Sequence, residues 1–243
     1  MSSSSKPKLK VDWASHKAVA FSCHNWHYSK SVPVPPLVKI GAWEDGEFIG
    51  VILFSRGASN NLYKPYGLEQ TEGCELTRIA LRNHKTPVSK IMKYAIVFLR
   101  RKCPGLKLIV SFADPEQGHF GGIYQAANWL YSGKTNGDKK YFDSNGKQWH
   151  SRMVKTKGWT MVNGIKRKCP KPNECVCVNT LGKYRYLLAL TKEMHAKILP
   201  LAMPYPKRVK QAIVESIDKA AEHHRPTRSN LLSEATRQEE LEV

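Results

Sequence analysis

The sequence predicts an α/β (α+β) fold built on a mixed sheet flanked by helices, and three observations carry this prediction. The β-rich stretches 37–43 and 48–55 flank Asp45-Gly46, a dipeptide typical of a tight hairpin turn. The nearly continuous apolar run 106–113 is typical of a central strand covered on both faces. One helical pattern precedes this run and another follows it. The order hairpin, strand, helix, strand, helix indicates an α/β or α+β domain with a mixed sheet.

The first third of the chain predicts short elements around this hairpin. We expect residues 1–12 to form a flexible basic arm and residues 16–23 a short helix. The run 32–36, Val-Pro-Val-Pro-Pro, must be extended because proline restricts itself and the residue before it. Residues 56–71 read as a polar loop, and 75–81, with the sequence ELTRIAL, as the next strand.

The main helix is expected to follow, with Thr86 as its N-cap and Pro87 at its first helical position. Basic residues in its last turn suit the helix dipole, and Pro104-Gly105 ends it. Its buried face recurs at the helical period and consists of Val88, Ile91, Met92, Ala95 and Leu99.

The later elements complete the predicted domain. They are a second helix at 123–131, a last strand at 183–190 and a surface helix at 207–223. We treat 205–243 as a C-terminal helix and tail with a mobile end.

The charge of the chain favours a polyanionic partner. The 243 residues carry a formal charge of +19, while the tail 205–243 has seven charges of each sign. A field of this size favours nucleic acid over a membrane surface. No stretch approaches the roughly 18 to 20 apolar residues of a membrane span, and no secretory signal is visible. We therefore expect a protein of the cytoplasm that does not bind membranes.

The basic charge is densest in segment 134–171. It holds 11 Lys and Arg against two Asp, interleaved with four aromatic side chains. We expect this segment to contact DNA phosphates, with Lys139, Lys140, Arg167 and Lys168 as the candidate contacts. The alternative is that these side chains only solvate a long loop.

The first candidate binding site lies at the start of the main helix. Free N–H groups at Val88 and Ser89, with Arg82 nearby, form an anion site suited to the pyrophosphate of a nucleotide-like cofactor such as coenzyme A. The alternative is a plain capped helix with exposed basic residues.

Arg78 and Asp114 are the next candidates. A guanidinium in mid-strand must be paired or reach an anion, so Arg78 either binds a ligand or pairs with an acid such as Asp114. Asp114 ends the central strand, the usual place for sites in open α/β sheets. It is a candidate general base, a candidate metal ligand, or only the turn-former before Pro115.

The segment His27-Tyr28-Ser29 and His119 add imidazole and phenol groups suited to proton transfer or metal binding. Together with Asp114 they offer oxygen and nitrogen ligands suited to non-haem iron, although a Tyr beside a Pro-rich run is commonly packing. For Cys169, Cys175 and Cys177 we favour structural thiols over zinc, because paired C-x2-C spacing is missing.

Several ordered segments resemble the Mom-type DNA-modification proteins of Mu-like phages. The resemblance spans about residues 23–190. It rests on the stretches NWHYSKSVP at 25–33, FSRGA at 54–58, CELTR at 74–78, PVSKI at 87–91, SFADP at 111–115 with Gly118-His119, and GIYQAANW at 122–129.

The resemblance implies a fold like that of the GCN5-related N-acetyltransferases, over residues 13–204, and N6-(carbamoylmethyl) modification of adenine in duplex DNA that shields phage DNA from host restriction. It places Tyr28, Arg78, Ser89, Asp114 and Tyr124 in the site, and it associates iron and acetyl-CoA or a related acyl donor with the family. The phosphate loop of acetyltransferases is Gly-rich, whereas residues 81–88 contain no Gly.

We assign hypothetical roles on this basis. Asp114 orients or deprotonates the adenine amine, Tyr28 and Tyr124 donate a proton or bind metal, and Arg78 pairs with the donor or with Asp114. A flipped adenine is expected to stack on Tyr124, Trp129 or Trp26.

Two other functions fit the sequence, and several properties stay open. The first alternative is an ordinary acyl-CoA-dependent N-acetyltransferase acting on a protein or small-molecule amine. The second is a non-enzymatic basic DNA-binding protein. The donor, the metal, the target context and the oligomeric state, a homodimer included, stay open.

Overall fold

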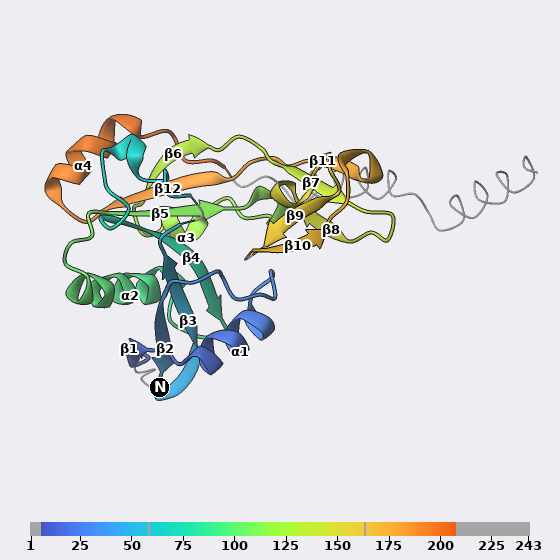
Figure 1. Cartoon of the computed structure of the whole chain (residues 1–243). Coiled ribbons are helices and arrows are strands. Elements are labelled where there is room, and N and C mark those ends of the chain that lie inside the picture. Colours follow the sequence, from blue (N-terminus) through green and yellow to red (C-terminus); the bar gives the residue numbers. More distant parts are fainter. Residues whose placement is uncertain (1–5, 58, 163, 208–243) are drawn as a thin grey trace, which may run out of the picture.

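The computed structural model describes residues 6–57, 59–162 and 164–207. A seven-stranded sheet runs through it in the order β1-β2-β3-β4-β5-β12-β6 (Figure 1). Strands β4 and β5 are parallel, whereas the other neighbouring pairs are antiparallel. The predicted α/β class with a mixed sheet is therefore confirmed. The strands are β1 (Leu9–Trp13), β2 (Leu37–Glu44), β3 (Glu47–Ser55), β4 (Gly73–Leu81), β5 (Leu108–Ala113), β6 (Leu130–Lys134) and β12 (Tyr184–Ala189).

Helices cover both faces of this sheet because its central strands are apolar on both sides. The helices are α1 (His16–Trp26), α2 (Val88–Lys102), α3 (Gly122–Gln125) and α4 (Lys192–Ile198). Side chains alternate along β3, so that Ile52 packs in the cluster that α2 covers, while Val51 packs in the cluster that α1 covers. Strand β5 divides in the same way between the α2 cluster and the α4 cluster. None of the helices in the described ranges is long and apolar enough to cross a membrane.

The predicted hairpin is confirmed. Strands β2 and β3 pair along their length and are joined by Asp45 and Gly46, with φ of 51° and 89°. Two central residues with positive φ define a type I′ turn, in which Asp-Gly is strongly favoured.

Two expectations near the chain start and the main helix are wrong. Residues 9–12 belong to the edge strand β1, which pairs with β2, rather than to a flexible arm; residues 1–5 lie outside the described ranges. Helix α2 begins at Val88 with Pro87 as its N-cap, and Thr86 does not cap it. Thr86 is buried, and its N–H donates to Glu44, which directs this residue toward β2 instead of toward the helix.

The second helix is shorter than predicted. Helix α3 ends at Gln125, because Asn128 adopts a left-handed φ of 56° and the chain enters β6 at Leu130. The predicted helix at 207–223 lies outside the described residues except for its first position.

Five short strands are inserted between β6 and β12. They form a three-stranded sheet, β11-β7-β8, and a two-stranded sheet, β10-β9. Figure 1 shows β5 running toward these yellow strands, on the opposite side from α2 and α4. The predicted basic segment therefore lies beyond the carboxyl end of β5. The strands are β7 (Lys139–Phe142), β8 (Gln148–His150), β9 (Trp159–Val162), β10 (Ile165–Lys168) and β11 (Val176–Asn179).

The Glu44 carboxylate stabilises the loop between β4 and α2. It accepts the N–H groups of Lys85 at 2.9 Å and Thr86 at 2.7 Å. The hydrogen bond from Lys85, followed by that from Thr86, lowers the pKa of Glu44 from 4.5 to about 2.

We predict that Glu44→Gln lowers the free energy of unfolding by about 2 kcal/mol at neutral pH, as for hydrogen bonds to a charged group. Because the folded-state pKa is depressed, this contribution is present above pH 4.5 and is lost as the pH falls toward about 2. Urea unfolding of both proteins across this pH range measures it. The exposed Glu47 provides a control, since Glu47→Gln should cost under about 1 kcal/mol. A difference between wild type and Glu44→Gln that does not shrink in acid would contradict this account.

Candidate functional site

The site lies where β4 and β5 separate. The two strands pair only from Gly73 with Leu108 to Leu76 with Ser111. Beyond this point β4 continues against β3, and β5 continues against β12. The opening between them gathers side chains from α1, β4 and the carboxyl end of β5.

Arg78 lies on β4 just beyond the separation. Its side chain is half-buried, and its buried Nε and Nη1 atoms have no hydrogen-bond partner in the described part of the chain. Burial lowers the pKa of Arg78, while the neighbouring Cys23 and Tyr28 act in the opposite sense. A guanidinium left in this state is poised to bind an anion or a carbonyl oxygen.

Tyr28 and His27 follow the end of α1 and lie within electrostatic reach of this guanidinium. The Tyr28 side chain is half exposed, and its partial burial, followed by the Asp114 carboxylate, raises its pKa above the ordinary value of 10.0. Burial, followed by the charge of Arg78, lowers the pKa of His27 to about 4, so its ring is neutral. The Ser29 N–H donates to His27 Nδ1 at 3.1 Å, which leaves the ring proton on Nε2.

Asp114 and His119 come from the end of β5. Asp114 Oδ1 accepts the N–H of Glu116 at 3.0 Å, and Oδ2 lies 3.6 Å from Lys183 Nζ. The carboxylate therefore also forms the turn that the sequence allowed, and its described ion pair is with Lys183 rather than Arg78. The exposed His119 ring stacks edge-on against Tyr28, with centroids 5.4 Å apart. Tyr28 thus lies within the electrostatic reach of both Arg78 and Asp114.

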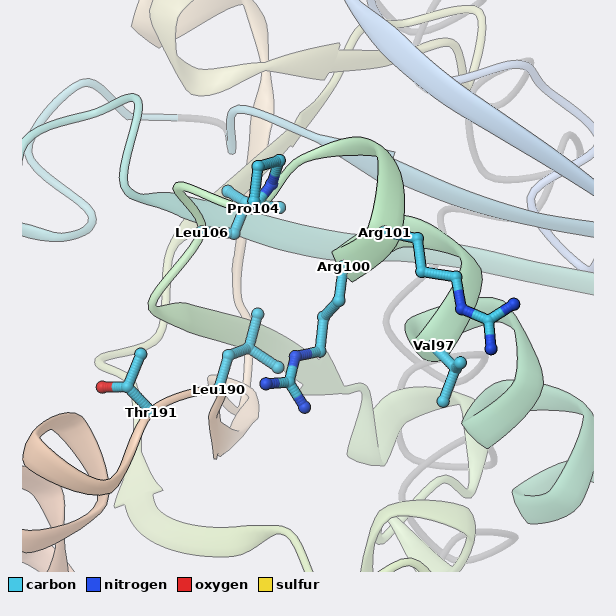
Figure 2. Close-up of a pocket in the computed structure, with 7 residues that line it drawn as sticks. All are labelled: Val97, Arg100, Arg101, Pro104, Leu106, Leu190 and Thr191. Atoms are coloured by element: carbon cyan, nitrogen blue, oxygen red, sulfur yellow. The ribbon is translucent and has the colours of Figure 1, made fainter.

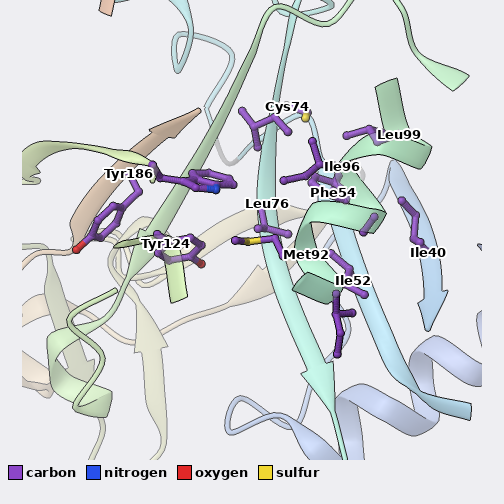
Figure 3. Close-up of a cluster of buried hydrophobic side chains, with 14 of the residues drawn as sticks. Ile40, Ile52, Phe54, Cys74, Leu76, Met92, Ile96, Leu99, Tyr124 and Tyr186 are labelled. Carbon is purple, nitrogen blue, oxygen red and sulfur yellow. The ribbon is translucent and has the colours of Figure 1, made fainter. Parts of the chain in front are cut away.

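Tyr124 lies behind this site, in the core. Its hydroxyl lies 2.7 Å from Ser111 Oγ, and Ser111 donates to the Leu76 carbonyl at 2.8 Å, across the last pairing of β4 and β5. Burial raises the pKa of Tyr124 to about 12. Figure 3 shows Tyr124 beside Tyr186 within the main cluster.

The expected stacking of adenine on Tyr124 or Trp129 is therefore wrong, since these rings are 8% and 1% exposed. Trp26 is also engaged, by Phe21 and Phe48.

The predicted iron ligands do not form a metal site. No group of three or more His, Cys, Asp or Glu side chains is placed to hold a metal ion within the described ranges. His27, Asp114 and His119 thus surround Tyr28 without converging as ligands. The same finding covers Cys169, Cys175 and Cys177, which are free thiols.

Some of the polar groups beside the predicted anion site at the start of α2 already have partners. Glu44 accepts two N–H groups of the loop before α2, and Arg82 forms an ion pair with Glu47. These carboxylates would repel a phosphate at this place. Val88 and Ser89, half-buried in the first turn of α2, remain the predicted contacts for a donor.

The predicted DNA contacts divide into two kinds. Arg167 and Lys168 are exposed on β10, where all four side chains point to solvent. Lys140 instead forms an ion pair with Glu116, close to Asp114. Lys139 lines a cavity at the same place.

Two cavities flank the core. One, of about 370 Å³, lies at the end of α2, where Arg100 extends toward Leu190 (Figure 2), and none of the predicted site residues line it. The other, of about 240 Å³, joins Asp114 and Lys183 to Trp149 of the inserted strand β8. Sequence reasoning missed Lys183 and gave Trp149 no role, although the aromatic residues interleaved with lysines in 134–171 were a signal.

Known proteins resemble this chain, one in sequence and others in the course of the backbone. The methylcarbamoylase Mom of Escherichia phage Mu is 24% identical over 188 residues, which cover 74% of this chain and 76% of that protein. A Bacillus subtilis acetyltransferase in complex with CoA superposes with a TM-score of 0.42 at 14% identity, over 76% of this chain and all of that one. FeeM, an N-acyl amino acid synthase from uncultured soil microbes, gives 0.43 at 10% identity, over 80% of this chain and 96% of that one.

The pattern of the Mom protein family matches residues 8–207. This range includes β1, the opening between β4 and β5, and the inserted basic strands. The chain therefore belongs to the Mom protein family.

Proposed function

We propose that this chain is a phage DNA-modification enzyme that converts adenine in duplex DNA to an N6-(carbamoylmethyl)adenine-type base and so protects phage DNA from host restriction in the host cytoplasm. The observation that carries the proposal is that Tyr28 lies within electrostatic reach of both Arg78 and Asp114 in a Mom family chain. The name of the Mu relative, a methylcarbamoylase, supports a transferase.

The residues divide the proton transfers between them. The adenine N6 amine forms the new N–C bond and loses one proton, which Asp114 accepts as general base. The N–H of Glu116 and the ammonium of Lys183 hold that carboxylate in place. Tyr28, whose pKa is raised above its ordinary value of 10.0, is protonated at neutral pH and donates a proton to the leaving group of the donor. The unpaired atoms of Arg78 bind the donor's polar group.

Tyr124 has a positioning role in this scheme. Its hydroxyl, through Ser111, fixes the last pairing before β4 and β5 separate. The donor that we propose carries the carbamoylmethyl group bonded through its methylene carbon to a leaving group, with Val88 and Ser89 as its contacts. Acetyl-CoA or a related acyl donor would deliver its carbonyl carbon instead, so it fits the alternative of an ordinary N-acetyltransferase. No step is assigned to iron, because the described side chains offer no ligand group for it.

Duplex DNA is the proposed partner. The body of the chain is strongly basic, and the exposed cations of β10 lie in the inserted region beyond the site. Such cations displace the counterions of a phosphate backbone, which drives binding.

Modification of DNA tests the proposal directly. Bacteria that express the chain should yield a heavier deoxyadenosine on mass analysis of digested DNA. Asp114→Asn should reduce this product about 100-fold or more, because general bases contribute about 10²–10⁴. Asp12→Asn, on the edge strand β1, should leave it unchanged. Unmodified deoxyadenosine in cells with soluble protein would contradict the proposal and favour an ordinary N-acetyltransferase or a simple DNA-binding protein.

The salt dependence of duplex binding tests whether the cations of β10 contact DNA phosphates. Arg167→Gln with Lys168→Gln should flatten the log–log slope by about 1.8, since each neutralised phosphate contributes about 0.9. Lys140→Gln should change the slope less, because Glu116 already occupies that ammonium. Fluorescence anisotropy at several salt concentrations gives the slopes. A slope that is unchanged in a folded double variant would place the duplex elsewhere, for example along residues 1–12.

A further inference from the structure

A cavity of about 240 Å³ opens beside Asp114 and has no role in the steps described so far. Its walls come from the end of β5, from the inserted strands β7 and β8, and from the segment before β12. The side chains that matter here are Asp114, Asp138, Gln148, Trp149, Ser151 and Lys183. Pockets for drug-sized ligands start at about 300 Å³, so this cavity suits a single flat group.

Trp149 gives the cavity an aromatic wall that is held in place. Its Nε1–H donates to Asp143 at 2.7 Å, and Lys147 Nζ lies 4.2 Å from its ring centroid. Trp149 is half-buried, whereas Tyr124 and Trp129 lie in the core. Among the aromatic side chains near Asp114, Trp149 therefore combines fixed orientation with access to a cavity.

Two carboxylates give the cavity acceptors for an amine. Asp138 accepts the Lys139 N–H at 2.7 Å and Ser151 Oγ at 3.3 Å, so it is fixed as Asp114 is. Acceptors of this kind bind an exocyclic amine, while the ammonium of Lys183 has N–H groups left to donate to a ring nitrogen. The cavity is lined by as many acidic side chains as lysines, so its formal charge is zero and it suits an uncharged base with an amine and ring acceptors. The acidic side chains are Asp114, Glu116 and Asp138, and the lysines are Lys139, Lys140 and Lys183.

We propose that this cavity receives the adenine that is rotated out of the duplex, with Trp149 stacking on the base and with Asp114 and Asp138 receiving its amine. The inference rests on the proposed function, which requires that an adenine leave the stack to reach Asp114. Stacking on an aromatic ring compensates for the lost stacking in the duplex. The exposed cations of β10 would hold the flanking backbone.

Photolabelling tests the cavity without depending on turnover. The full chain is irradiated with a random-sequence duplex that carries 8-azidoadenine, and tryptic peptides are analysed by mass spectrometry. We expect label on fragment 148–152, which trypsin releases because Lys147 precedes it and Arg152 ends it. A matched duplex with 5-azidouracil should label this fragment at least fivefold less. Equal labelling by both duplexes, or no adenine label on this fragment, would overturn the inference.

Variants of Trp149 test whether its ring stacks on the adenine. Trp149→Ala should lower the adenine label on fragment 148–152 at least tenfold, with duplex affinity within threefold of wild type. Trp149→Phe keeps a ring and should retain most of the label. Trp159→Phe is the matched control, because Lys157 and Lys166 also stack on Trp159, which does not line the cavity. An undiminished label in folded Trp149→Ala would remove the stacking role.

The two failures are distinguishable. If deoxyadenosine is modified in cells but the label falls outside the cavity, the function stands and the inference fails. If the label falls on fragment 148–152 but deoxyadenosine stays unmodified, the cavity binds the base and the proposed reaction fails.

Discussion

The parting of β4 from β5 is the constraint on which the rest of the structure depends. The two strands share only the pairings from Gly73–Leu108 to Leu76–Ser111. Ser111 closes this last step by donating to the Leu76 carbonyl, while it also contacts the buried hydroxyl of Tyr124. Past that step each strand keeps one neighbour on its outer side, so the sheet stays continuous in hydrogen bonding while a gap opens within it.

This gap explains why polar groups can persist so close to an apolar core. Arg78 extends from β4 into the opening, where burial lowers its pKa and two of its nitrogens lack partners. Leaving a buried guanidinium in this state costs stability unless a ligand satisfies it. Tyr28 lies within electrostatic reach of both Arg78 and Asp114, and burial and the carboxylate raise its pKa. The unpaired nitrogens of Arg78 can therefore bind a polar group of the donor. They lie on the side of the sheet from which a base would enter past the inserted strands.

Sequence reasoning captured the parts of the fold that local patterns encode. Asp45-Gly46 specified a type I′ turn, and the apolar period of α2 identified its buried face. It failed where residues that are far apart in the sequence come into contact in the fold. Glu44 satisfies the loop before α2 from the end of another strand, so Thr86 is not a cap. The sequence pattern proposed Tyr28 and Asp114 separately. Their proximity depends on the parting of two strands, which spacing along the chain does not reveal.

The most direct measurement of this account is the rate at which a bound duplex acquires modified deoxyadenosine when Arg78 is replaced by methionine. Arg78→Met keeps an unbranched side chain as far as the position of Nε and removes the guanidinium that the opening leaves unpaired. Arg185→Met on β12 serves as the comparison. We predict that Arg78→Met lowers this rate about 100-fold or more, while duplex affinity stays within threefold of wild type and the comparison variant remains active. A rate near that of wild type in folded Arg78→Met would contradict the placement of the site between β4 and β5.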